Sequence, residues 1–103
     1  MSRGPDAATL LTSALLKNAE RAGCPIAQLT ADWDRWASAT FNGARHRLTF
    51  RAPRSPALDS WIAGLPETDL PLRGHLVADI EAVARRAHGD TIEFDVEALT
   101  VES

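Results

Sequence analysis

The feature that most constrains the fold is an alternation of apolar and acidic residues near the end of the chain. Residues 91–101 read Thr-Ile-Glu-Phe-Asp-Val-Glu-Ala-Leu-Thr-Val. A period of two places alternate side chains on opposite faces of a β-strand. The segment therefore predicts a strand with one charged face and one apolar face, and the apolar face needs a covering layer.

The preceding segment, residues 75–88, has two interpretations. As a helix it carries an apolar stripe that ends at Gly89, and as a strand it pairs with residues 92–101 across a three-residue loop, His88-Gly89-Asp90. The loop sets these pairs opposite each other: Ala84 and Phe94, Ile80 and Ala98, and Glu81 and Glu97. Because apolar residues then meet apolar ones, we favour the hairpin and keep the helix as the alternative.

A second hairpin is predicted around Asn42-Gly43, a pair typical of tight two-residue turns because both positions need a positive φ. This turn sets Phe41 opposite Ala44 and Trp36 opposite Thr49. One face of the hairpin is mostly apolar and includes His46, whereas the other carries arginines. The run from Ile26 to Trp36 suits either a strand or a helical turn.

Two helices are predicted from their termini. Asp6 is a candidate N-cap for a helix over residues 7–22, which Gly23 ends. Ser55 followed by Pro56 predicts a second, shorter helix that ends at Gly64.

This order predicts a single α+β domain over residues 1–103, with a duplicated αββ pattern and a four-stranded antiparallel sheet that carries both helices on one face. If residues 75–88 are helical instead, the order becomes αββααβ, the connectivity of one class of KH domain. The segment Gly64–Gly74 is acidic and lacks the two glycines, separated by two residues, that clamp RNA in such domains.

Charge is distributed unevenly along the chain. Residues 1–54 carry eight Lys/Arg against four Asp/Glu, whereas residues 55–103 carry three against ten. On the predicted sheet, both groups lie on the face away from the helices, which we predict to be an interaction face made of Trp36, Arg45, Arg47, Arg51, Asp79, Glu81, Glu93, Asp95 and Glu97. Glu81 opposite Glu97 requires a nearby cation, from an arginine of the other hairpin or of a second copy.

These features favour a binding module without catalytic activity. Its partner is either a second copy of the chain, which gives a homodimer, or an unknown protein. Weak nucleic-acid binding through Arg45, Arg47, Arg51 and Trp36 is an alternative. The acidic residues on the same face and the pI near 5.5 oppose it.

An enzyme or a metal-binding protein is the other alternative. By strand alternation His75 shares a face with Asp79 and Glu81, and imidazole with carboxylates can bind a divalent ion. His46 is expected to be partly buried, and Asp32 and Asp34 suit a solvated turn or a carboxylate pair for acid–base work. No nucleotide-binding or zinc motif is present in the sequence, and we expect no metal and no cofactor.

The composition also bears on the cellular location and the source of the protein. A single cysteine, Cys24, cannot form an internal disulfide and is expected to pack as a small apolar residue. The run Ala7–Leu16 is too short to span a membrane and lacks the flanks of a secretory signal, which favours the cytoplasm. The excess of arginine over lysine favours a bacterial source.

Overall fold

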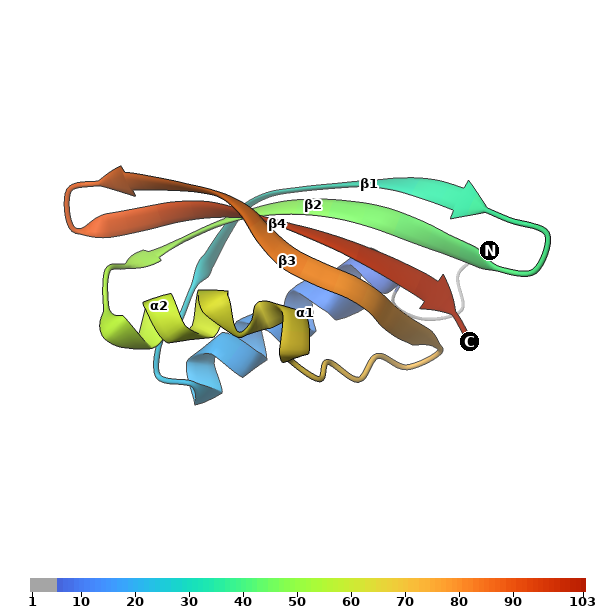
Figure 1. Cartoon of the computed structure of the whole chain (residues 1–103), viewed down its shortest axis with the longest axis horizontal. Helices are drawn as coiled ribbons and strands as arrows, with labels where there is room; N and C mark the ends of the chain where they lie inside the picture. Colours follow the sequence, from blue (N-terminus) through green and yellow to red (C-terminus); the bar gives the residue numbers. More distant parts are fainter. Residues whose placement is uncertain (1–5) are drawn as a thin grey trace.

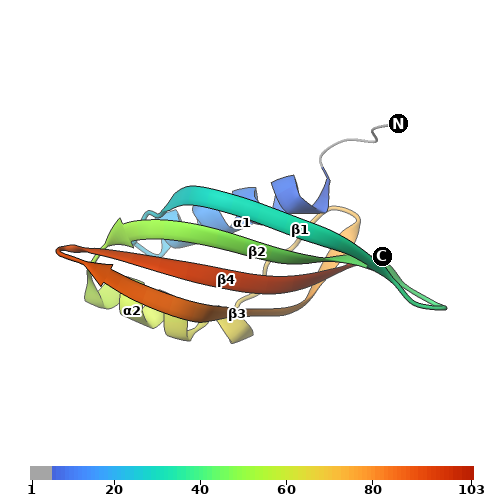
Figure 2. The same cartoon turned by 90° about the horizontal axis from the view of Figure 1, so that it is seen from above.

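The computed structural model describes residues 6–103, which form two layers. The elements in chain order are α1 (Ala7–Arg21), β1 (Ala27–Ala37), β2 (Asn42–Pro53), α2 (Pro56–Ala63), the short 3-10 helix η1 (Leu65–Glu67), β3 (His75–His88) and β4 (Thr91–Glu102). The strands form one antiparallel sheet in the order β1-β2-β4-β3. Both helices lie beneath one face of it (Figures 1 and 2). The predicted α+β fold is confirmed, and residues 75–88 are a strand.

Both helices begin where their capping residues predict. The Asp6 carboxylate accepts a hydrogen bond from the Thr9 amide at 2.9 Å, and the Ser55 hydroxyl accepts one from the Leu58 amide at 3.0 Å. Pro56 occupies the first turn of α2, where its missing N–H costs nothing. Within residues 6–103, no helix is both long and apolar enough to cross a membrane.

The core lies between the helices and the underside of the two central strands. Phe50 of β2 and Phe94 of β4 are fully buried, with ring centroids 5.7 Å apart. Trp61 of α2 packs edge-on against Phe94, and its indole N–H donates to the Asn18 side chain of α1 at 2.8 Å. These aromatic contacts join both helices to the centre of the sheet.

The pairing of β2 with β4 brings the basic and acidic halves of the chain together. Phe50 lies opposite Phe94 on the underside, while Arg47 lies opposite Glu97 and Arg51 opposite Glu93 on the upper side. Unlike charges and like apolar residues therefore face each other at one register, which stabilises the pair on both faces.

The hairpin of β1 and β2 forms, but its predicted turn and register are wrong. Residues 38–41 make the turn, in which the Ser38 hydroxyl accepts from the Phe41 amide at 3.1 Å and the Ser38 amide donates to the Phe41 carbonyl at 2.8 Å. Asn42 and Gly43 belong to β2, and Trp36 faces Gly43 instead of Thr49. The shift from Thr49 to Gly43 is an even number of residues, so the side chains keep their predicted faces.

For the hairpin of β3 and β4, the predicted register is correct near the centre and wrong near the turn. Ile80 faces Ala98 and Glu81 faces Glu97, as predicted. A bulge between Ala82 and Ala84 then shifts the register, so Arg85 lies opposite Phe94 and Ala84 opposite Asp95. The bulge leaves a two-residue turn, in which Gly89 adopts the left-handed backbone with φ 60°.

Gly43 provides a test of the corrected register. A Cβ atom at this position would lie 2.1 Å from the Thr100 carbonyl oxygen and 2.8 Å from the Trp36 indole nitrogen. We expect Gly43→Ala to lower the free energy of unfolding by about 1–3 kcal/mol, because the strands must separate to admit the methyl group. Urea denaturation measures this change.

Gly43→Asn distinguishes the two explanations for a glycine at this position, which are a turn that needs a left-handed backbone and a strand position too crowded for a side chain. Asparagine tolerates a left-handed backbone, so a turn at Asn42-Gly43 would accept it with little loss. A crowded strand position rejects it as strongly as alanine. An asparagine variant as stable as the parent chain would contradict the register described above.

Candidate functional site

No helix within residues 6–103 covers the upper face of the sheet, which we call the open face (Figure 1). The strand pairing places on it all nine residues that the sequence predicts for an interaction face. Their arrangement was not predictable, because the sequence left the order of the two hairpins in the sheet open.

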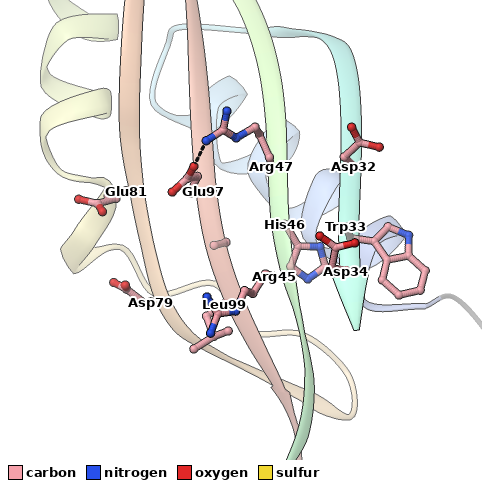
Figure 3. A pocket seen from close by; sticks show the side chains of 11 residues that line it. Asp32, Trp33, Asp34, Arg45, His46, Arg47, Asp79, Glu81, Glu97 and Leu99 are labelled. Carbon is pink, nitrogen blue, oxygen red and sulfur yellow. Dashed lines mark hydrogen bonds and ion pairs between the residues drawn. The ribbon is translucent and has the colours of Figure 1, made fainter. Parts of the chain in front are cut away.

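A hollow of about 410 Å³ lies at the centre of the open face. It brings together five of the nine predicted residues, namely Arg45, Arg47, Asp79, Glu81 and Glu97. Figure 3 shows the side chains that line the hollow spread across all four strands, with the carboxylates of β3 on one side and Asp32 and Asp34 of β1 on the other. Trp36, Arg51, Glu93 and Asp95 lie outside the hollow.

The sequence interpretation missed Asp32 and Asp34 as part of this site. Both were expected in a solvated turn before the strand or as a carboxylate pair for acid–base work, whereas β1 begins at Ala27 and runs through them. The alternation of Thr30, Asp32, Asp34 and Trp36 is the signal that identifies these residues as one strand face.

Arg47 supplies the cation that the like-charged Glu81 and Glu97 require. Its guanidinium forms an ion pair with Glu97 within the same chain, and this contact raises the pKa of Arg47 (Figure 3). Of the two sources predicted for this cation, the neighbouring hairpin is therefore the one used.

The acidic residues at the two edges of the hollow are not neutralised in this way. Asp32 and Asp34 on β1, and Asp79 and Glu81 on β3, are exposed. Among the residues that the structure describes, none of the four forms an ion pair. The hollow thus has two acidic borders with Arg45 and Arg47 between them.

A second charge cluster lies on the open face beyond the hollow. Arg86 of β3 donates to Glu93 and to Asp95 of β4, each at 3.0 Å. The Arg86 guanidinium, together with the Thr49 hydroxyl at 2.8 Å, holds the pKa of Asp95 below its usual value. Because these acids are already paired, this cluster has a structural role.

Trp36 lies at the opposite end of the open face, over Gly43. Its indole nitrogen is buried and has no hydrogen-bond partner among residues 6–103. The ring covers the glycine, whose missing side chain leaves room for it, so Trp36 acts mainly in packing.

The predicted grouping of His75 with Asp79 and Glu81 is wrong. A bulge between Val77 and Asp79 turns His75 to the underside, where it lines a separate cavity of about 130 Å³ with His46 and Thr100. Asp79 and Glu81 stay on the open face, so His75 does not converge with them. Within the described residues, no group of three or more His, Cys, Asp or Glu side chains is suited to hold a metal ion.

His46 is 4% exposed, and its Nε2 atom lies 2.9 Å from the Thr100 hydroxyl oxygen. The ring predicted to be partly buried is thus almost fully buried, and its partner is the side chain of a buried threonine. Burial lowers the pKa of His46, Asp6 at the start of α1 opposes this effect, and His75 adds to it. Cys24 is buried as predicted, and burial raises the pKa of its thiol.

His46 makes stability depend on pH. Its pKa in the folded protein lies below the ordinary value of 6.5, so just below pH 6.5 the unfolded chain binds a proton that the folded chain does not. The free energy of unfolding should therefore decrease as the pH is lowered below 6.5, by at most about 1.4 kcal/mol per pH unit. Urea unfolding between pH 7.5 and about 5 measures the slope.

The matched variants for this prediction are His46→Gln and His88→Gln. Replacing His46 should reduce the slope, whereas replacing the exposed His88 keeps His46 and should preserve it. Equal slopes in the parent chain and His46→Gln would show that the buried ring does not carry the pH dependence.

The ion pair of Arg47 and Glu97 predicts a charge-exchange result. Arg47→Glu adds a carboxylate beside Glu97 and Asp32, and should lower the urea midpoint more than the neutral Arg47→Gln. Adding Glu97→Arg should recover part of the loss in a monomer, because the two side chains meet within one chain. Sedimentation confirms the oligomeric state, and a double variant no more stable than Arg47→Glu would refute the pairing.

The open face thus offers carboxylates at both borders of a hollow, two arginines between them and the apolar side chain of Leu99. Exposed carboxylate and guanidinium groups of this kind can form ion pairs with a charged ligand. Comparison with known proteins finds no matching family model, no matching curated protein and no matching solved structure.

Proposed function

We propose that the protein is a non-catalytic binding module whose open face receives a positively charged segment of a partner protein. The observation that carries the proposal is the set of four exposed carboxylates, Asp32, Asp34, Asp79 and Glu81, that border the hollow without ion pairs among the described residues. Lysine or arginine side chains of a partner would neutralise them.

The balance of charge in the hollow supports a cationic ligand. Arg47 is paired with Glu97, which leaves Arg45 against four carboxylates. A single exposed ion pair contributes only about 0–1 kcal/mol, so several must form together for useful affinity. The two acidic borders offer that number within one hollow, while nucleic-acid phosphates would be repelled by the same groups.

A basic partner fits the face better than a second copy of the chain. Two copies that stack their open faces are related by a two-fold axis in the plane of the sheet. An axis along the strands sets β1 over β3, and an axis across them sets β1 over β1. Because both border strands are acidic, carboxylates face carboxylates in either arrangement, which disfavours the stack.

The test is a titration with an arginine-rich peptide, followed by amide NMR shifts at low ionic strength. We expect shifts in β1 and β3 near the hollow, and a dissociation constant that rises as salt is added. The variant Asp32→Asn, Asp34→Asn, Asp79→Asn, Glu81→Gln should bind at least about tenfold more weakly, which corresponds to the loss of about 1.4 kcal/mol.

The control is Glu67→Gln with Asp69→Asn, which removes two exposed carboxylates away from the open face. It should bind like the parent chain. If the control loses as much affinity as the border variant, the binding depends on net charge and not on the hollow. Sedimentation that showed a dimer dissociated by salt would favour a second copy as the occupant.

A further inference from the structure

The hollow has a repeated pattern across the sheet. The strand pairing aligns two rows, each with one residue from β1, β2, β4 and β3 in that order. The first row is Asp32, Arg47, Glu97 and Glu81, and the second is Asp34, Arg45, Leu99 and Asp79. Each row therefore begins and ends with a carboxylate and has an arginine in between.

From this pattern we infer that the open face selects a segment with two positive charges about 14 Å apart, lying across the strands. The inference rests on the proposed function and specifies its ligand. The two border strands are separated by three inter-strand spacings of about 4.8 Å. Each border holds two carboxylates from neighbouring rows, about 7 Å apart along the strand, which together surround one cation.

The arginines on β2 determine what occupies the middle of the segment. Arg45 repels a positive charge held between the borders, and its neighbour in the row is the apolar Leu99. The central side chain of the ligand should therefore be uncharged and apolar. Clustered positive charge satisfies only one border and meets Arg45 or Arg47 at the next strand.

Extended backbone matches this requirement. Four residues of an extended chain span about 14 Å and return the side chain to the same side, with the intermediate side chain at the second residue. A helix needs about nine residues for that distance, which turn it two and a half times and place the second cation on the far side. The preferred ligand is thus an extended segment with basic residues at positions i and i+4 and an apolar residue at i+2.

Two capped heptapeptides of identical composition test the spacing. One has two arginines separated by Ser-Leu-Ser, and the other has adjacent arginines, with serines completing both. In an NMR titration at low ionic strength, the separated peptide should bind about three- to fivefold more tightly, as expected for one additional exposed ion pair. It should also shift amides of β1 and β3 together, whereas the adjacent peptide should shift those of one border.

Variants of one border at a time complete the test. Asp79→Asn with Glu81→Gln should abolish the preference for the separated peptide, and so should Asp32→Asn with Asp34→Asn. Glu67→Gln with Asp69→Asn should retain it. Urea midpoints verify that each variant is folded.

The outcomes separate this inference from the proposed function. Equal affinities for the two peptides, with binding that still depends on the border carboxylates, would overturn the spacing and leave the proposed function standing. A preference that survives neutralisation of either border would also overturn the spacing. Binding of neither peptide would overturn the proposed function and the inference together.

Discussion

The pairing of β2 with β4 is the contact on which the rest of the structure depends. It sets Phe50 opposite Phe94 in the core, where Trp61 of α2 packs against Phe94, and Arg47 opposite Glu97 on the open face. One register therefore satisfies the apolar and the charged sides of both strands. On the open face, the ion pair of Arg47 with Glu97 joins the basic half of the chain to the acidic half.

The outer strands, β1 and β3, differ from the central pair because they are bulged and acidic. β1 and β3 both contain bulges, and each presents carboxylates at the hollow. Bulges and charged residues on edge strands oppose the addition of further strands to a sheet. The acids that protect the edges are also the groups that we propose for binding a basic segment.

The underside of the sheet contains a polar pair that is independent of the open face. His46 and Thr100 bond to each other among otherwise apolar residues of the central strands, beside the start of α1. A buried hydrogen-bonded pair of this kind specifies register, because slipping either strand leaves both groups without a partner. His75 joins this side only because of the bulge that precedes Asp79.

Local patterns in the sequence determined the two helices and their caps, favoured both hairpins, and placed all nine residues of the predicted interaction face on one side of the sheet. Capping acts within three or four residues, and strand alternation survives any even shift of register, so these features do not depend on distant parts of the chain. The tertiary structure decided the order of the hairpins, the turn at residues 38–41 and the bulges in β1 and β3. Contacts between residues far apart in the chain, such as Phe50 with Phe94 and Gly43 with Thr100, set those features, and they alone bring Asp32 and Asp34 to the same hollow as Asp79 and Glu81.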